Sequence, residues 1–126
     1  SSLTAGAANN ITLDNANDFV GAVSIVSGNN VTLNDVNALT VGGALAGTLT
    51  TTAGGATTYD ALNVGQNLAA TAGGLISDAG NVVVAGTTTL TAGGNDVVLN
   101  HADDFGGAVT IVSAKMLKSR KLSIII

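Results

Sequence analysis

The stretch His101-Ala102-Asp103-Asp104 is the only part of the sequence that combines residue types suited to acid–base chemistry. An imidazole next to carboxylates can transfer protons or bind a metal ion. Asp103 and Asp104 are adjacent, however, so on a strand their side chains would point to opposite faces and could not act together on a glycosidic bond. In the repeat described below, His101 and Asp103 align with Asn15 and Asn17, which are polar turn positions. We therefore expect a polar corner exposed to solvent here, and we predict that the chain is not an enzyme.

Metal binding is limited by the ligands that the chain offers. The sequence has one His, no Cys and no Glu, which is too few ligands for a zinc site. Two aspartate pairs, Asp14 with Asp18 and Asp103 with Asp104, are weak candidates for calcium. Residues 93–96, Gly-Gly-Asn-Asp, match part of a nine-residue calcium-binding repeat, but the match occurs only once. We expect an ordinary Gly-Asn corner there, and no cofactor.

Charge is distributed unevenly along the chain. Eight aspartates are spread over the body, whereas the basic residues are confined to the end of the sequence: Lys115, Lys118, Arg120 and Lys121. A body without cations cannot neutralise phosphates, which argues against nucleic-acid binding. It also lacks the Arg or Lys that polysaccharide lyases use.

No apolar run approaches the roughly 18–20 residues of a membrane helix, so no membrane span is expected.

The elements that would position these residues repeat along the chain. Residues 11–28 and 97–114 match at ten positions with an offset of 86 residues. A Thr-Ala-Gly or similar motif ends at Gly6, Gly28, Gly54, Gly73, Gly93 and Ala114. Its spacings of 22, 26, 19, 20 and 21 residues predict that the offset equals four turns of about 21 residues. Phe19 and Phe105 should then occupy equivalent levels.

Short alternating strands separated by Gly and Asn fill each repeat, as in Ile11-Thr12-Leu13 after Asn9-Asn10. Gly, Asn, Thr and Val are weak helix formers, so helix is a poor alternative. We predict an all-β fold, a parallel β-solenoid of about five coils, three-sided and right-handed. Corner Asn and Thr side chains should bond to one another along the stack. A β-sandwich is the rival fold, although its strands need not resemble one another.

The longest spacing of the motif, 26 residues, indicates an insertion at residues 56–60. We expect this insertion to form an exposed loop. Tyr59, the only Tyr in the chain, and the neighbouring Asp60 are the candidate binding residues of that loop.

Residues 3–113 resemble the repeat regions of filamentous-haemagglutinin-like proteins, the large exoproteins that Gram-negative bacteria export by two-partner secretion. The resemblance is carried by the segments LTAG, TTAGG, TAGG and LTAGG, by the strands NNITL and NNVTL, and by Val41-Gly42-Gly43 and Asn63-Val64-Gly65. It implies a right-handed parallel β-helix, a secreted or cell-surface location, and an adhesive or stalk role. The secretion domain of that family is not visible here, so we expect an interior piece of a longer chain.

The last residues break the pattern. We divide the chain into a repeat domain, residues 1–113, and a basic and apolar tail, residues 114–126. The tail has three interpretations: a non-native extension, a cap over the last coil, or a segment that binds a membrane or a partner. A cap is physically sensible because an open coil exposes unpaired strand edges.

The leading functional hypothesis is a non-enzymatic structural or adhesive shaft of an exported bacterial surface protein. Its partners would be neighbouring repeats of the parent chain and a glycan or protein receptor on a host cell or other surface. The first alternative is a carbohydrate-binding or carbohydrate-active β-helix. The second is an ice-binding β-solenoid, suggested by Thr-x-Thr pairs at residues 48–52 and 87–91. We expect that Thr array to be interrupted at the coils containing residues 24–27 and 69–71.

Overall fold

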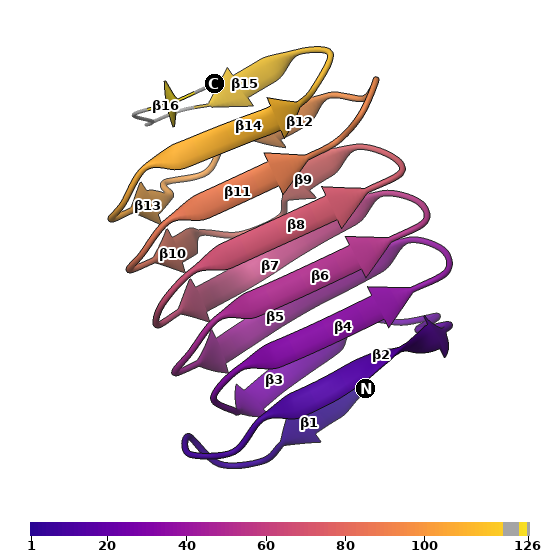
Figure 1. Cartoon of the computed structure of the whole chain (residues 1–126), viewed down its shortest axis with the longest axis vertical. Helices are drawn as coiled ribbons and strands as arrows, with labels where there is room; N and C mark the ends of the chain where they lie inside the picture. Colours follow the sequence, from indigo (N-terminus) through magenta and orange to yellow (C-terminus); the bar gives the residue numbers. More distant parts are fainter. Residues whose placement is uncertain (120–123, 126) are drawn as a thin grey trace.

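The chain forms a stack of β-strand coils (Figure 1). The computed structural model describes residues 1–119, 124 and 125, and none of these residues is helical. A seven-stranded sheet contains β2 (Ile11–Asn17), β4 (Val31–Asp35), β6 (Leu49–Ala53), β8 (Leu68–Ala72), β11 (Thr88–Thr91), β14 (Val109–Ser113) and β16 (Ile124–Ile125). A nine-stranded sheet contains β1 (Ser2–Thr4), β3 (Val23–Ser27), β5 (Leu39–Leu45), β7 (Thr57–Val64), β9 (Ile76–Asp78), β10 (Val82–Val84), β12 (Val97–Leu99), β13 (Asp104–Phe105) and β15 (Leu117–Ser119).

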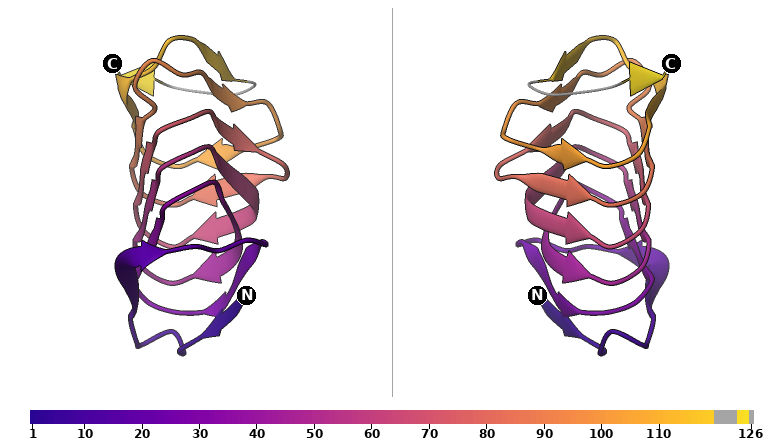
Figure 2. Two further views of the ribbon diagram at one scale, coloured as in Figure 1. Left: turned by 90° about the vertical axis from the view of Figure 1, so that its right-hand side faces the viewer. Right: turned by 90° about the vertical axis from the view of Figure 1, so that its left-hand side faces the viewer.

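Every strand pairs in parallel with the equivalent strand of at least one adjacent coil. In Figure 1 the strands of the seven-stranded sheet run to the right in front, those behind run to the left, and the chain rises from indigo to yellow, so the coils are right-handed. Figure 2 shows the coils stacked along one axis. The predicted β-solenoid is confirmed, with about six turns of about 19 residues rather than five of about 21.

The nine-stranded sheet bends around a corner and thereby supplies two sides of each coil. β7 pairs with β9 through Thr57–Tyr59 and with β10 through Leu62–Val64. The bend lies between these two halves, where Ala61 has a positive φ of 45°. Together with the seven-stranded sheet, this gives the three-sided coil that the sequence predicts.

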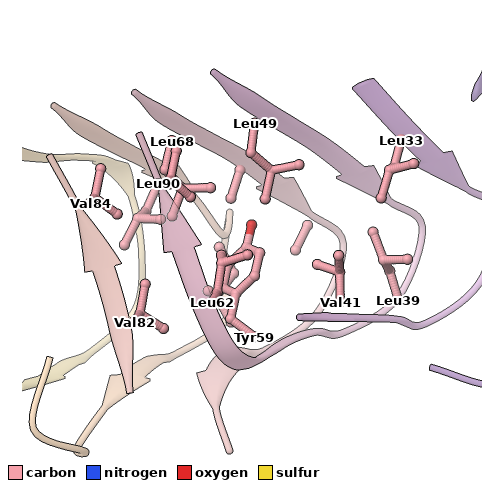
Figure 3. Close-up of a cluster of buried hydrophobic side chains, with 14 of the residues drawn as sticks. Leu33, Leu39, Val41, Leu49, Tyr59, Leu62, Leu68, Val82, Val84 and Leu90 are labelled. Carbon is pink, nitrogen blue, oxygen red and sulfur yellow. The ribbon is translucent and has the colours of Figure 1, made fainter. Parts of the chain in front are cut away.

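Alternation of apolar and polar residues produces the core. In β4, β6 and β8 every second side chain is buried, beginning with Val31, Leu49 and Leu68, which are directly in register. Period-two alternation places these residues on one face of the sheet, where each packs against its copy above and below. Figure 3 shows aliphatic side chains from both sheets meeting inside the coils. Because each layer is small, the core needs only one buried aromatic residue among those described, Tyr59.

The 86-residue offset does not correspond to a whole number of turns. Ile11 lies in β2 of the seven-stranded sheet, whereas its sequence partner Val97 lies in β12 of the nine-stranded sheet. Phe19 precedes β3 and Phe105 lies in β13, so the prediction that they occupy equivalent levels is wrong. The two sheets have similar alternating strands followed by small-residue corners, and this similarity makes a fractional turn look like a full repeat.

The predicted insertion at residues 56–60 is also wrong. The motifs ending at Gly6 and Gly28 follow strands of the nine-stranded sheet, whereas those ending at Gly54 and Gly73 follow strands of the seven-stranded sheet. The long spacing therefore records a change of corner and not an extra loop. Most of the predicted insertion belongs to β7, in which Tyr59 is only 1% exposed.

Corner asparagines link successive coils, but mostly through the backbone rather than through one another. The Oδ1 atoms of Asn10, Asn30 and Asn67 accept hydrogen bonds from the backbone N–H of Asn30, Thr48 and Thr87 in the following coil. A contact between side chains, from Thr87 Oγ1 to Asn67 Oδ1, accompanies one of them. The prediction that these side chains bond to one another is therefore correct for Thr87 and Asn67 and wrong for the other two contacts, in which the backbone is the donor.

The segment assigned to a separate tail contributes strands to both sheets. β15 pairs with β12, and the backbone N–H of Val97 donates to Met116 O at 2.8 Å. β16 pairs with β14. Arg120 and Lys121 of the predicted basic tail lie outside the described residues. Within the described part of the chain, no helix is present that could cross a membrane.

Candidate functional site

Among the described residues, the strongest concentration of titratable groups lies at the bend of the nine-stranded sheet, after β9 in one coil and after β12 in the next. Asp78 ends β9, and His101 and Asp103 belong to the turn between β12 and β13 in the next coil. His101 Nδ1 lies 3.0 Å from Asp78 Oδ1; the histidine side chain is 41% exposed and the aspartate side chain is fully buried. The coil stacking brings these residues together although 22 residues separate Asp78 from His101 in the chain.

Asp103 points into the fold, in contrast to the solvent-exposed corner that the sequence suggested. It is 3% exposed, and its Oδ1 accepts a hydrogen bond of 2.8 Å from the backbone N–H of Val82. Its Oδ2 is buried without a hydrogen-bond partner among the described residues. Burial raises the pKa of Asp103 to about 6, and the neighbouring Asp78 carboxyl adds to this increase.

The pKa of Asp78 is shifted in the opposite direction. Burial acts to raise its pKa, but contacts with His101 and Asp103 and the backbone N–H groups of Asn100 and His101 hold the pKa below its ordinary value. Those two N–H groups each lie 3.2 Å from a carboxylate oxygen of Asp78. The pair therefore favours an ionised Asp78 beside an Asp103 that retains its proton in mildly acidic solution.

The arrangement stabilises the turn. Both carboxyls accept hydrogen bonds from backbone N–H groups of an adjacent coil, as buried polar groups require. Asp104 is exposed on β13, so the prediction that Asp103 and Asp104 point to opposite faces is confirmed. Sequence reasoning missed Asp78, which could have been found only by placing His101 about one coil after it.

Comparison with protein families gives a match to "Repeats of unknown function (DUF5649)" over residues 1–26 and 46–112. The chain belongs to this family. Neither the curated proteins nor the solved structures provide a match. The DUF5649 match skips residues 27–45, yet β4 in that segment pairs in register with β2 before it and β6 after it. The coil between the two matched segments is thus a full member of the stack.

The other candidate residues of this DUF5649 chain are dispersed. Asp14 is exposed on β2, and Asp18 Oδ1 accepts a hydrogen bond from Asn37 Nδ2 at 3.3 Å. Within the described ranges, no group of three or more His or acidic side chains is arranged to hold a metal ion. The calcium candidates therefore form at most pairs.

The Gly-Asn segment at residues 93–96 forms a corner, as the sequence predicts. Gly93 has a φ of +62°, in the left-handed region that favours glycine. The side-chain amide of Asn95 donates to Ala92 O in its own turn and to Gly73 O in the preceding coil. Its backbone carbonyl accepts a hydrogen bond from the N–H of Lys115 in the following coil.

Asp35 is a buried carboxylate that sequence reasoning did not single out. It is 1% exposed and accepts hydrogen bonds from the backbone N–H groups of Phe19 and Asn37. Like Asp78, it ends a strand and satisfies N–H groups where the chain turns. Buried aspartates at strand ends are thus a structural device used at more than one corner of this DUF5649 chain.

Of the two predicted binding-loop residues, only Asp60 is accessible. Tyr59 points into the core, and its hydroxyl lies 2.6 Å from Thr51 Oγ1. Asp60 is exposed and borders a depression of about 340 Å³ on the nine-stranded sheet, together with Ala22, Thr40 and Ala61. The interpretation of Tyr59 as an exposed contact residue is therefore wrong, whereas Asp60 remains available at the surface.

Proposed function

We propose that this chain is a non-enzymatic shaft segment of a large exported bacterial surface protein of the filamentous-haemagglutinin-like kind. The observation that carries the proposal is the continuous parallel pairing from β2 through β14, in which each coil bonds directly to the next. Such a stack is quasi-one-dimensional, and further coils can extend it without a change of geometry. Rigid display of binding sites at a distance from the cell is the role that this geometry suits.

The hydrogen bonds at the corners support rigidity. Hydrogen bonds from one coil to the next are accepted at the exposed corners by the side chains of Asn10, Asn30 and Asn67. At buried corners they are accepted by the carboxylates of Asp35 and Asp78. Because corners as well as strands are bonded between coils, bending the rod would break several kinds of contact together. A surface or secreted location and contact with a glycan or protein receptor belong to the same proposal.

A carbohydrate-active enzyme has weaker support. Its best acid–base candidates are Asp78 and Asp103, but both carboxyls are buried and bonded to the backbone, so neither could reach a glycosidic oxygen. Glycan platforms commonly use exposed aromatic rings, and the single Tyr of this chain is in the core. We therefore favour the structural role.

Labelling of intact source bacteria with an antibody raised against this chain tests the location. We expect equal labelling before and after the cells are made permeable, together with loss of the signal after brief protease treatment of intact cells. A periplasmic marker, detected only in permeable cells, is the control. Labelling that requires permeabilisation, with no antigen in the culture medium, would contradict the proposal.

A further inference from the structure

A row of threonines runs across the outer face of the seven-stranded sheet. The row is formed by residues that pair directly between successive strands: Thr12, Thr32, Thr50, Ala69, Thr89 and Thr110. The residues on either side of each position in β4, β6, β8, β11 and β14 are buried. Since side chains alternate across a sheet, the row faces solvent.

A second outward row lies two residues further along the strands. Thr52, Thr71 and Thr91 pair directly in β6, β8 and β11, and Asn34 extends the row into β4. Three consecutive coils thus carry Thr-x-Thr, Ala-x-Thr and Thr-x-Thr on one surface. In the front view of Figure 1 these strands lie one above another on the side that faces the reader.

The sequence-based expectation of two interruptions is corrected by the register. Residues 24–27 belong to β3 in the nine-stranded sheet and do not face this surface at all. The only gap in the first row between Thr12 and Thr110 is Ala69. The array is therefore more continuous than the linear sequence suggests, because the chain alternates between two sheets.

The spacing of the two rows is regular in both directions. Neighbouring strands lie about 4.8 Å apart, and residues i and i+2 of one strand lie about 6.6 Å apart. Threonine is β-branched and therefore stiff at χ1, so each position presents a hydroxyl and a methyl group in a similar orientation. From β4 to β14 the outward positions of these strands carry no charge.

From this face we propose a further activity: binding of the chain to the surface of ice. A rigid, uncharged array of hydroxyl and methyl groups can order water in a two-dimensional pattern, with strand spacings comparable to the oxygen spacings on ice planes. The hydroxyls supply hydrogen bonds to that water, while the methyl groups disfavour a disordered hydration layer. The activity depends on this one face and is independent of any receptor or cell-surface role.

Other occupants fit the face less well. Sugar rings stack on exposed aromatic side chains, and the two threonine rows contain none. Anionic lipid headgroups require cations, which are absent from the outward positions of β4 to β14. A second copy of this chain is the remaining competitor, and a measurement of oligomeric state distinguishes it.

Thermal hysteresis and inhibition of ice recrystallisation test the proposal with the full chain. We expect both activities in the natural sequence and loss of most of each in Thr50→Tyr, whose bulky ring would hold the ice plane away from the centre of the array. The Ala69→Thr variant fills the gap in the first row and should raise both activities. Circular dichroism of every variant ensures that a change reflects the surface and not unfolding.

The matched control is Thr58→Tyr in β7. Thr58 is half-buried and faces outward like Thr50, but it lies on the nine-stranded sheet, between Thr40 and Ser77. This variant should retain full activity. A folded natural chain with no effect on ice would overturn the proposal, as would equal loss in Thr50→Tyr and Thr58→Tyr. A dimer that Thr50→Tyr disrupts, with no effect of either form on ice, would instead assign the face to a second copy.

Discussion

Individual polar side chains inside the core explain how such small coils stack in one register. Four of the six buried polar side chains in the described core contact a polar partner: Asp35, Thr51, Asp78 and Asp103. The hydroxyls of Thr57 and Thr88 have no hydrogen-bond partner among the described residues. An unpaired buried polar group costs about 1–3 kcal/mol, so these contacts disfavour any register that would break them. Residue-level predictions follow from the two best-defined contacts.

The first residue-level prediction concerns Asp103. Its pKa in the folded protein, about 6, exceeds its ordinary value of 3.8, so the folded state binds more protons than the unfolded state between these values. The contribution of Asp103 to the free energy of unfolding should therefore fall as pH rises from about 4 to about 6, by at most about 3 kcal/mol. The Asp103→Asn variant should lose this decrease, as measured by urea unfolding between pH 4 and pH 7.

Asp104→Asn provides the matched control, because Asp104 is the adjacent residue and is exposed. Its pH profile should follow that of the natural chain. Below pH 4 both proteins should lose stability, because the pKa of Asp78 is held below its ordinary value and its ionised form favours the folded state. An unchanged profile for Asp103→Asn between pH 4 and pH 7 would contradict the proton retention assigned to this pair.

The second residue-level prediction concerns the hydroxyl pair of Tyr59 and Thr51. Removing either hydroxyl leaves the other buried without this partner, so Tyr59→Phe and Thr51→Val should each lower the free energy of unfolding by about 1–3 kcal/mol. The double variant should lose less than the sum of the two single losses, because no orphaned hydroxyl remains. Additive losses in a urea double-mutant cycle would show that the 2.6 Å contact contributes nothing specific.

At the scale of the elements, strand formation follows from the sequence but the assignment of strands to sheets does not. Alternation at Ile11, Leu13, Val31 and Leu33 predicts strands with one buried face, and that prediction is confirmed for Val31 and Leu33. Both sheets use the same alternation and the same small-residue corners, so residue types alone do not distinguish a full turn from a fraction of one. When the offset of 86 residues is interpreted as four whole turns, Tyr59 is predicted in a loop and the continuity of the threonine rows is not recognised.

The element-level prediction concerns Gly43 of β5, at the point where the pairing of β5 with β7 shifts in register. Gly43 has a φ of +108°, and a Cβ at this position would overlap the carbonyl oxygen of Ile25 in the preceding coil. Gly43→Ala should therefore lower the free energy of unfolding by more than about 2 kcal/mol or prevent folding. Gly21→Ala is the control, because a Cβ there would meet nothing within 4 Å. Equal thermal melting of the two variants would contradict the tight approach between coils.

At the scale of the whole molecule, the candidate site could be predicted from the sequence only in part. The polar character of residues 101–104 is evident in the sequence, whereas the partner Asp78 lies in the preceding coil and depends on the correct turn length. Stacking, rather than sequence proximity, decides which groups meet. It also makes the stability of each coil depend on its two neighbours.

The whole-molecule prediction is a gradient of protection along the rod. Inner strands such as β6 and β8 pair on both sides, whereas β1 and β2 each pair with one described strand only. Coils with a single neighbour lose half of their interface energy, so local opening should begin at the ends and move inward. Hydrogen exchange measured by mass spectrometry should therefore be slowest for residues 49–72 and faster for residues 2–17. Uniform exchange over all coils would mean that the stack unfolds as one unit, and the nearest-neighbour description of this solenoid would then be wrong.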